Sequence, residues 1–294
     1  MPTRWLSYAH HLAGYEFYMR DELEVAQQAL TESLEEGGDY AIRLLRLVEA
    51  ELEVRETGVR LRTQHFECEL PQRRPQGTAA LLREAPETCY EALARSLDFV
   101  PQRKLLITVL SGVEVLEFTS SPFGYYVPKR DLHKICLPLV GRRYLPNLWK
   151  GLVHEYTHAA VEELSEHNHP SWLTEGLAVH FAHEIARDRD LLADARSTGL
   201  EFTSLGGIEG FFSDPGKDLY SDEATQAYAE SYSAVRFLWE RCGADGLRRL
   251  LAELRHGRPL AIALRAACGM WPWRFEHEWR AAAESGRELL AWAP

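Results

Sequence analysis

The amino-acid sequence predicts an α+β fold, in which a small mixed sheet is followed by a larger helical block. Segments with the pattern of strands are confined to residues 63–140 of the 294-residue chain. After Pro146, nearly every segment has the period of an amphipathic helix. Strands and helices that come in separate groups, rather than in alternation, are typical of the α+β class.

The first 60 residues are predicted to be helical. Asp21 and Glu24 fit a capping box at the start of one helix, and Gly37–Gly38 ends that helix. Asp39 is placed to cap a second helix. This pair resembles a single tetratricopeptide-like hairpin, although a plain helical cap on the next domain would give the same pattern. We therefore predict an N-terminal helical segment over residues 1–62.

The predicted sheet comes next. Residues 65–70 alternate in polarity, and residues 104–110 form a compact apolar run suited to a buried strand. Residues 133–140 are a third candidate strand, and Pro138 within it argues for an edge position because proline lacks a backbone donor. The segments between these strands are predicted to be a helix over 78–99 and a loop over 111–131.

The remainder of the chain is predicted to be helical, apart from a glycine-rich loop near 204–217. Apolar residues recur at helical spacing in six segments that are separated by glycine, proline or short polar stretches. The predicted helices cover 146–165, 171–187, 223–241, 244–256, 259–268 and 272–289. The sheet and these helices together are predicted to form one domain over residues 63–294.

The charge balance argues against nucleic acid as a partner. Acidic residues outnumber basic ones by 44 to 33, which gives a formal net charge of -11, and no basic cluster stands out. Such a surface repels phosphate backbones. No apolar run approaches the roughly 18 residues that span a bilayer, and no segment resembles a signal peptide. We therefore expect a cytoplasmic protein that binds neither nucleic acid nor membrane.

The cysteines are interpreted as reduced thiols. They are odd in number, widely spaced and never arranged as CxxC. This usage is typical of buried, free thiols in a reducing compartment. The five residues concerned are Cys68, Cys89, Cys136, Cys242 and Cys268.

The segment His154-Glu155-Tyr156-Thr157-His158 is an HExxH motif inside a predicted helix. Residues four apart lie on one face of a helix, so both imidazoles can reach a single metal ion. Glu155, next to the first histidine, can lie beside a water molecule at the metal and take its proton. The motif predicts a metal-assisted hydrolase, although two helical histidines without a metal would give the same letters.

Glu175 is the candidate third ligand. It lies in the sequence WLTEGLA, near the start of the next predicted helix. Catalytic zinc is held by three protein ligands and keeps a fourth position open for water. A carboxylate on a second helix supplies the missing ligand, and the small residues Gly176 and Ala178 permit close helix approach. The alternative is an exposed surface glutamate.

The motif HEYTH followed by WLTEGLA resembles the gluzincin group of zinc metallopeptidases, which includes thermolysin, and is most similar to peptidase MA-like domain proteins. The resemblance covers Gln64–Trp279. It implies a thermolysin-like catalytic domain, one Zn²⁺ per chain and a peptide or protein substrate. It also implies that His154, His158 and Glu175 are the zinc ligands and that Glu155 is the general base.

The same resemblance implies a tyrosine that stabilises the oxyanion of a tetrahedral intermediate. Tyr228 aligns best with that position. The Lys-Gly pair that follows it in the gluzincin aminopeptidases is replaced here by Glu230 and Ser231. Tyr232, one helical turn later, is the competitor, and a half-buried tyrosine without a catalytic role is the remaining alternative.

The chain also departs from the thermolysin pattern in the groups that support the ligands. The acid expected four residues after Glu175 is Val179. Glu162 and Glu184 are both candidates for orienting a ligand histidine, and the sequence does not choose between them. The other histidines nearby are expected to be polar surface residues, namely His167, His169, His180 and His183.

These observations predict a zinc-dependent hydrolase, in the first place a metallopeptidase. Its strand 133–140 would hold an extended peptide by backbone pairing, and Phe123, Tyr125 and Tyr126 would line the cleft. The alternative is a metal-binding scaffold or interaction protein with a structural or inactive zinc site, which a fourth protein ligand would favour. Cleavage specificity, whether endo- or exopeptidase, and oligomeric state are left open by the sequence.

Overall fold

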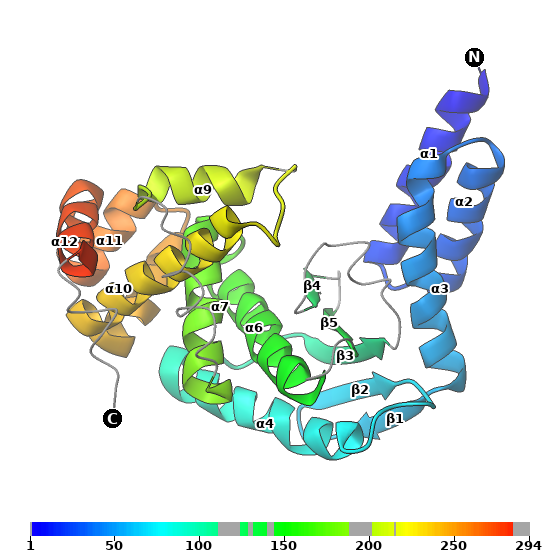
Figure 1. The fold of residues 1–294 in the computed structure, drawn as a ribbon, viewed down its shortest axis with the longest axis horizontal. Coiled ribbons are helices and arrows are strands. Elements are labelled where there is room, and N and C mark those ends of the chain that lie inside the picture. The colour runs from blue at the N-terminus through cyan, green and yellow to red at the C-terminus, as the bar shows by residue number, and fades with distance from the viewer. Residues whose placement is uncertain are drawn as a thin grey trace. The chain divides into compact units, whose positions relative to one another are not determined.

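A computed structural model describes residues 2–110, 124–128, 132–139, 144–187, 202–214 and 216–284 (Figure 1). The fold is mixed α+β, mostly helical with one five-stranded sheet, so the predicted fold class is confirmed. The chain divides into two compact units, Met1–Thr88 with Pro101–Glu155, and Cys89–Val100 with Tyr156–Pro294. The domain boundary proposed at residue 62 stays a prediction.

The first unit begins with three helices, one more than the predicted pair. They are α1 (Pro2–Met19), α2 (Leu23–Glu35) and α3 (Ile42–Thr57), with a 3₁₀ turn at Asp39–Ala41 before α3. The capping predictions are wrong at both Asp21 and Asp39. Asp21 has a φ of 63° and its carboxylate accepts hydrogen bonds from Arg55 and Lys134, so it cannot cap α2. Asp39 begins the 3₁₀ turn, and no side-chain cap precedes α3.

The sheet has the strand order β1-β2-β3-β5-β4. The inner strands β2, β3 and β5 are parallel, and an antiparallel strand pairs at each side. The strand bounds are β1 Val59–Arg62, β2 Phe66–Leu70, β3 Lys104–Leu110, β4 Tyr125–Pro128 and β5 Leu132–Pro138. The three predicted strands are confirmed, whereas the short outer strands β1 and β4 were assigned to a helical segment and to a loop.

The edge position predicted for the third strand is wrong. β5 lies between β3 and β4, and its residues as far as Cys136 are paired on both sides. Pro138 is tolerated because it ends the strand, beyond the last residue paired with β4. The proposal that this strand holds a substrate by backbone pairing falls with it, since residues 133–136 have no free edge.

One face of the sheet packs on the N-terminal helices. Alternate residues of a strand point to the same face, and Leu110 of β3 and Cys136 of β5 enter one core with α1–α3. The opposite face meets the first half of α4 (Thr78–Leu97), where the thiol of Cys68 lies against the carbonyl of Leu82. The three helices and the sheet of this unit therefore share one hydrophobic core.

A buried charge lies in that core. Lys134 of β5 has a fully buried side chain, and its ammonium group contacts the carboxylates of Glu51 and Asp21. Tyr18 and Tyr125 both donate hydrogen bonds of 3.0 Å to Glu51. Burial alone would lower the pKa of Lys134, but the carboxylates outweigh it and raise that pKa. Tyr125 is thus part of this cluster rather than of a cleft, and Phe123 lies outside the described residues.

The second unit is helical. It contains the later parts of α4 and of α6 (Tyr144–Ser165). Its other helices are α7 Ser171–Ala186, α9 Leu205–Ser213, α10 Asp222–Arg255, α11 Leu260–Cys268 and α12 Pro272–Glu284. The two helices predicted over 223–256 are joined in α10, with a kink at Gly243, whose φ is 62°. The predicted end of the last helix, at residue 289, lies outside the described residues.

The predicted loop near 204–217 is wrong over its first half, which is α9. The hydroxyl of Ser204 caps this helix by accepting a hydrogen bond of 3.1 Å from the backbone of Gly207. Leu205, Ile208 and Phe212 recur at helical spacing and are buried. This burial stabilises the helix in spite of its three glycines, each of which lowers intrinsic helix propensity.

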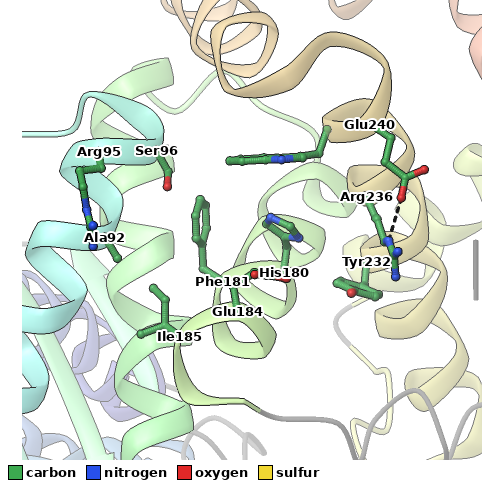
Figure 2. A pocket seen from close by; sticks show the side chains of 11 residues that line it. Ala92, Arg95, Ser96, His180, Phe181, Glu184, Ile185, Tyr232, Arg236 and Glu240 are labelled. Atoms are coloured by element: carbon green, nitrogen blue, oxygen red, sulfur yellow. Dashed lines mark hydrogen bonds and ion pairs between the residues drawn. The ribbon is translucent and has the colours of Figure 1, made fainter. Parts of the chain in front are cut away.

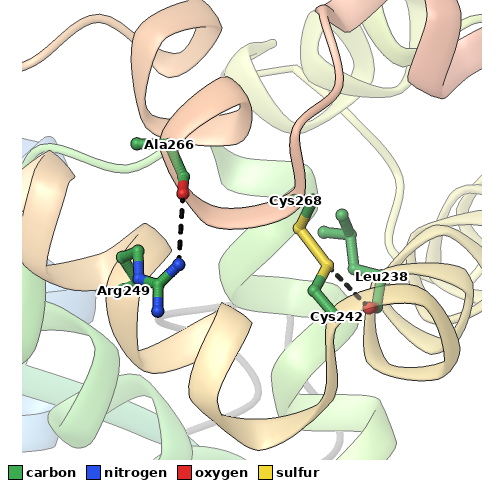
Figure 3. The surroundings of a disulfide bond; sticks show 5 residues. All are labelled: Leu238, Cys242, Arg249, Ala266 and Cys268. Carbon is green, nitrogen blue, oxygen red and sulfur yellow. Dashed lines mark hydrogen bonds between the residues drawn. A yellow bond between two sulfur atoms is a disulfide. The ribbon is translucent and has the colours of Figure 1, made fainter.

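The interpretation of all five cysteines as free thiols is also wrong. Cys242 and Cys268 form a disulfide that joins α10 to α11 across 26 residues (Figure 3). Cys68, Cys89 and Cys136 are free and buried, as predicted. Because disulfides are rare in reducing compartments, the bonded pair counts against the reducing-compartment argument. No helix among the described residues has both the length and the apolarity needed to cross a bilayer.

Candidate metal centre

Helix α6 presents His154 and His158 one turn apart. The helix is fixed by an apolar stripe on a neighbouring face, and the four residues that form the stripe are buried. They are Leu148, Leu152, Tyr156 and Ala159. The ring of Tyr156 packs against Phe99 at a centroid distance of 5.7 Å. The histidine pair is therefore carried by a helix that its neighbours hold in place.

The three predicted ligands form one group. One side-chain donor atom from each of His154, His158 and Glu175 lies within 4.8 Å of the others, and no other such group of three occurs in the part of the chain that the structure describes. The Nε2 atom of His158 and the Oε2 atom of Glu175 are 3.6 Å apart. Two ligands of a tetrahedral zinc ion, with bonds of about 2.0–2.2 Å, are separated by roughly 3.4 Å. The donor set therefore fits such an ion.

Glu155 lies beside this group on α6. Its side chain is only 4 % exposed, in a helical turn that holds one of the ligand histidines. The predicted ligands His158 and Glu175 are 15 % and 19 % exposed, so the group is shielded yet open to solvent. A carboxylate in such surroundings can exchange a proton directly with a reacting group rather than with bulk water.

Several contacts position the helix that carries Glu175. Helix α7 has no capping side chain of its own, and the carboxylate of Glu209 from α9 takes that role. It accepts hydrogen bonds from the hydroxyl of Ser171 at 3.0 Å and from the backbone of Trp172 at 3.2 Å. The indole of Trp172 then stacks on Phe275 at 5.9 Å. Glu175 therefore lies one turn after the start of α7, and these contacts fix the position of that start.

Thr174 contacts the predicted ligand His158. Its hydroxyl lies 3.0 Å from Nδ1 of that histidine. When Nε2 faces a metal, Nδ1 carries the proton and donates it to an oxygen, which fixes the ring. Thr174 was not predicted from the sequence, because the thermolysin pattern gives this supporting role to an acid. The residue precedes Glu175 directly, so its place beside the ligand was its only signal.

The two acids considered for this role have other partners. Glu162 contacts His167 and lies 3.6 Å from Nε2 of His169. Burial would raise the pKa of Glu162, but these two histidines outweigh it and lower that pKa. Glu184 lies 3.6 Å from Nδ1 of His183. Neither contact involves a proposed zinc ligand.

The tyrosine candidates lie in different surroundings. The ring of Tyr228 is partly buried and packs edge-on against Phe212 at 5.2 Å. Tyr232 is buried, and its ring packs against those of His180 and His183 at centroid distances of 6.1 and 5.5 Å. The assignment of an oxyanion donor stays a prediction.

The departure at Glu230 has a structural explanation. Its buried carboxylate accepts a hydrogen bond of 3.0 Å from the backbone of Thr203 and one of 2.6 Å from the side chain of Gln226. Burial raises the pKa of Glu230, and these bonds oppose that effect. Glu230 therefore ties the segment before α9 to α10.

Four nearby histidines were predicted to lie on the surface, and this prediction is wrong for two of them. His180 and His183 are buried, because α7 is apolar on nearly all sides and packs against α10. His167 is exposed as predicted, and His169 is mostly covered against Glu162.

The comparison with known families agrees with this description. A family model described as the Peptidase MA superfamily matches residues 131–285, which is more than half of the chain. The chain therefore belongs to the peptidase MA superfamily. The matched stretch contains the HExxH helix, Glu175 and α10. No curated protein matches the chain at a significant level.

Proposed function

We propose that the protein is a zinc-dependent metallopeptidase of the gluzincin type, with a thermolysin-like catalytic domain and a peptide or protein substrate. The observation that carries the proposal is the group formed by His154, His158 and Glu175, with Glu155 beside it. Membership of the peptidase MA superfamily supports the reaction class.

His154, His158 and Glu175 would hold the zinc ion. When bound, the ion supplies Lewis-acid chemistry, which polarises a carbonyl and lowers the pKa of water. Thr174 keeps the imidazole of His158 in the orientation and tautomer that a ligand needs. The chain's own residues thereby fix the position in which a peptide carbonyl is attacked.

Glu155 would move the proton. Its carboxylate accepts a proton from the attacking water and returns it to the nitrogen of the leaving amine. General acid–base groups of this kind contribute about 10²–10⁴-fold in rate. We assign the oxyanion contact to Tyr228, since Tyr232 is buried and packs against His180 and His183.

The scaffold alternative has less support. A structural zinc site is closed by a fourth protein ligand, and the group found among the described residues has three members. An acid such as Glu155, next to an open coordination position, has a role in a hydrolytic zinc site and none in a structural one.

The test is to measure zinc per chain and cleavage of a peptide library by three proteins. Wild type should bind one zinc ion and cleave peptides, Glu155→Gln should keep the zinc and lose at least 100-fold in kcat, and His158→Ala should lose both. Glu166→Gln, just after the end of α6, is the control and should behave as wild type. The proposal fails if wild type binds no stoichiometric zinc or if Glu155→Gln cleaves equally well.

A further inference from the structure

A cavity and an exposed stripe of large side chains both lie outside the proposed metal centre. The cavity, of about 340 Å³ between α4, α7 and α10, is lined by both guanidinium groups and carboxylates (Figure 2). They belong to Arg95, Arg236, Glu184 and Glu240. These opposite charges favour neither an anionic nor a cationic ligand. The stripe lies on α1, and its spacing and charge define what it can bind.

The stripe consists of four large, uncharged side chains. Trp5, Tyr8, Leu12 and Tyr15 are 78 %, 49 %, 49 % and 45 % exposed. Their spacing of three, four and three residues places them on one side of α1, within an arc of about 80°. Exposed side chains of this kind that gather in one patch mark an interaction surface, whereas single ones are ordinary.

Helix α1 uses a different face to pack against α2. Gly14 lies so close to Leu30 that a Cβ atom would be 2.6 Å from its Cγ atom. On the same face, the hydroxyl of Ser7 donates a hydrogen bond of 3.0 Å to the carbonyl of Ser33. Ser7 and Gly14 are buried, and their face is centred about 130° around the helix axis from the stripe. The stripe therefore remains exposed after α1 has packed.

Tyr40 extends the stripe. It comes from the 3₁₀ turn before α3, is 48 % exposed and packs edge-on against Tyr8 at a centroid distance of 6.3 Å. With a full accessible area of roughly 200 Å² for each such side chain, the five together expose about 500 Å². Two copies placed face to face would cover about 1,000 Å², which is the lower limit for a specific interface. The area is enough for a reversible dimer.

The spacing of the stripe favours a helix as the partner. Residues 5, 8, 12 and 15 occupy a and d positions of a heptad pattern, through which helices pair in coiled coils. A helix that lies on a membrane surface has instead a polar face rich in lysine and arginine. Residues 5–20 contain no lysine and one arginine, Arg20.

The charges beside the stripe allow that helix to belong to a second copy. Between Trp5 and Arg20, Glu16 is the only carboxylate in the sequence, and it binds Arg20 at 2.7 Å. This surface is therefore locally neutral. The chain as a whole has a net charge of -11, which opposes association through its other surfaces.

We propose that two copies of this chain form a dimer through the stripe, with α1 of one copy against α1 of the other about a two-fold axis. Two-fold symmetry lets one patch serve both sides, and it is the commonest symmetry of protein oligomers. Association removes apolar area from water on both copies. The interface uses no residue of the proposed metal centre, so it does not depend on the proposed peptidase activity.

The test is sedimentation velocity of the full chain at concentrations of about 1–200 μM. Wild type should shift from a monomer of 33.6 kDa to a species of twice that mass as the concentration rises. Flotation with vesicles of phosphatidylcholine and phosphatidylglycerol is measured in parallel. A wild type that stays monomeric throughout overturns the proposal, and binding of that monomer to the vesicles would assign the stripe to a membrane instead.

Two matched variants locate the interface. The double variant Trp5→Glu, Leu12→Glu should weaken dimerisation at least tenfold, because it places carboxylates in an apolar contact. Trp273→Glu makes the same change at a tryptophan that is 70 % exposed on α12, and should dimerise as wild type does. Equal dimerisation of the stripe variant, or loss of the dimer in Trp273→Glu, overturns the proposal. If the charged variant fails to fold by circular dichroism, Trp5→Ala with Leu12→Ala, which keeps helix propensity, replaces it under the same criterion.

Discussion

At the scale of single residues, we predict that the hydroxyl of Thr174 strengthens zinc binding by orienting His158. It is buried and lies 3.0 Å from Nδ1 of His158. We predict that Thr174→Val, which keeps the shape and removes the hydroxyl, weakens zinc binding by about 10–100-fold. Competition with a chromogenic chelator measures this. Thr88→Val, which removes an exposed helical hydroxyl, should leave zinc affinity unchanged. Equal affinities of all three proteins would exclude a supporting role.

We predict that His180 makes the free energy of unfolding depend on pH. Burial, His183 and Arg236 hold its pKa at about 4 in the folded state, against 6.5 in the unfolded chain. The unfolded state therefore binds the extra proton, so this contribution is complete above pH 6.5 and is lost as pH falls towards 4. The full loss is about 3 kcal/mol.

Urea denaturation between pH 4 and 7 measures this dependence. His180→Phe should show a shallower loss of unfolding free energy than wild type over this window. His256→Phe, which replaces an exposed histidine just after the end of α10, should follow the wild-type curve. Parallel curves for all three proteins would mean that His180 titrates normally.

The juxtaposition of His154 and His158 was predictable from spacing, because two residues four apart on a helix share a face whatever the tertiary fold. Glu175 followed from the need for a third ligand. The partner of His158 and the burial of His180 were not predictable, since both depend on how α7 packs. A histidine on an apolar helix face gives no sign of whether another helix covers it.

At the scale of elements, the contact between α7 and α10 depends on Gly176. A Cβ atom there would lie 2.3 Å from the carbonyl of Ser231 and 2.6 Å from Cγ2 of Val235. We predict that Gly176→Ala lowers the free energy of unfolding by about 1–3 kcal/mol, because the helices must separate. Gly210→Ala in α9, where a Cβ atom meets nothing within 4 Å, should instead raise it by about 0.4–1 kcal/mol. Urea denaturation of both variants checks the opposite signs.

The elements that the sequence predicted well are long, as α6 and α7 are. β1 and β4 have four residues each, which is too short for alternation to be recognised. The strand position of Pro138 was misjudged because a proline at a strand end costs no ladder bond. α9 was missed because its glycines outweighed its buried apolar stripe. Tertiary burial decided each of these cases.

For the whole molecule, the disulfide is the main covalent constraint. It closes a 26-residue separation beside the kink at Gly243. We predict that reduction lowers the free energy of unfolding by about 3 kcal/mol, mainly by freeing the unfolded chain. Urea denaturation with and without dithiothreitol measures it. The double variant Cys242→Ser, Cys268→Ser should be insensitive to the reductant, and a wild-type protein that is equally insensitive would contradict the prediction.

The ammonium group of Lys134 gives the N-terminal helices a role of their own. In a strand inside the sheet, the buried ammonium group of Lys134 is not hydrated by water. Its partners Glu51 and Asp21, and the hydroxyl of Tyr18 that binds Glu51, all come from the helical segment. These groups replace the hydration shell that the cation leaves behind. The helices thus supply, in place of water, oxygen atoms that solvate one buried cation. A sheet without these helices would need an uncharged residue at position 134.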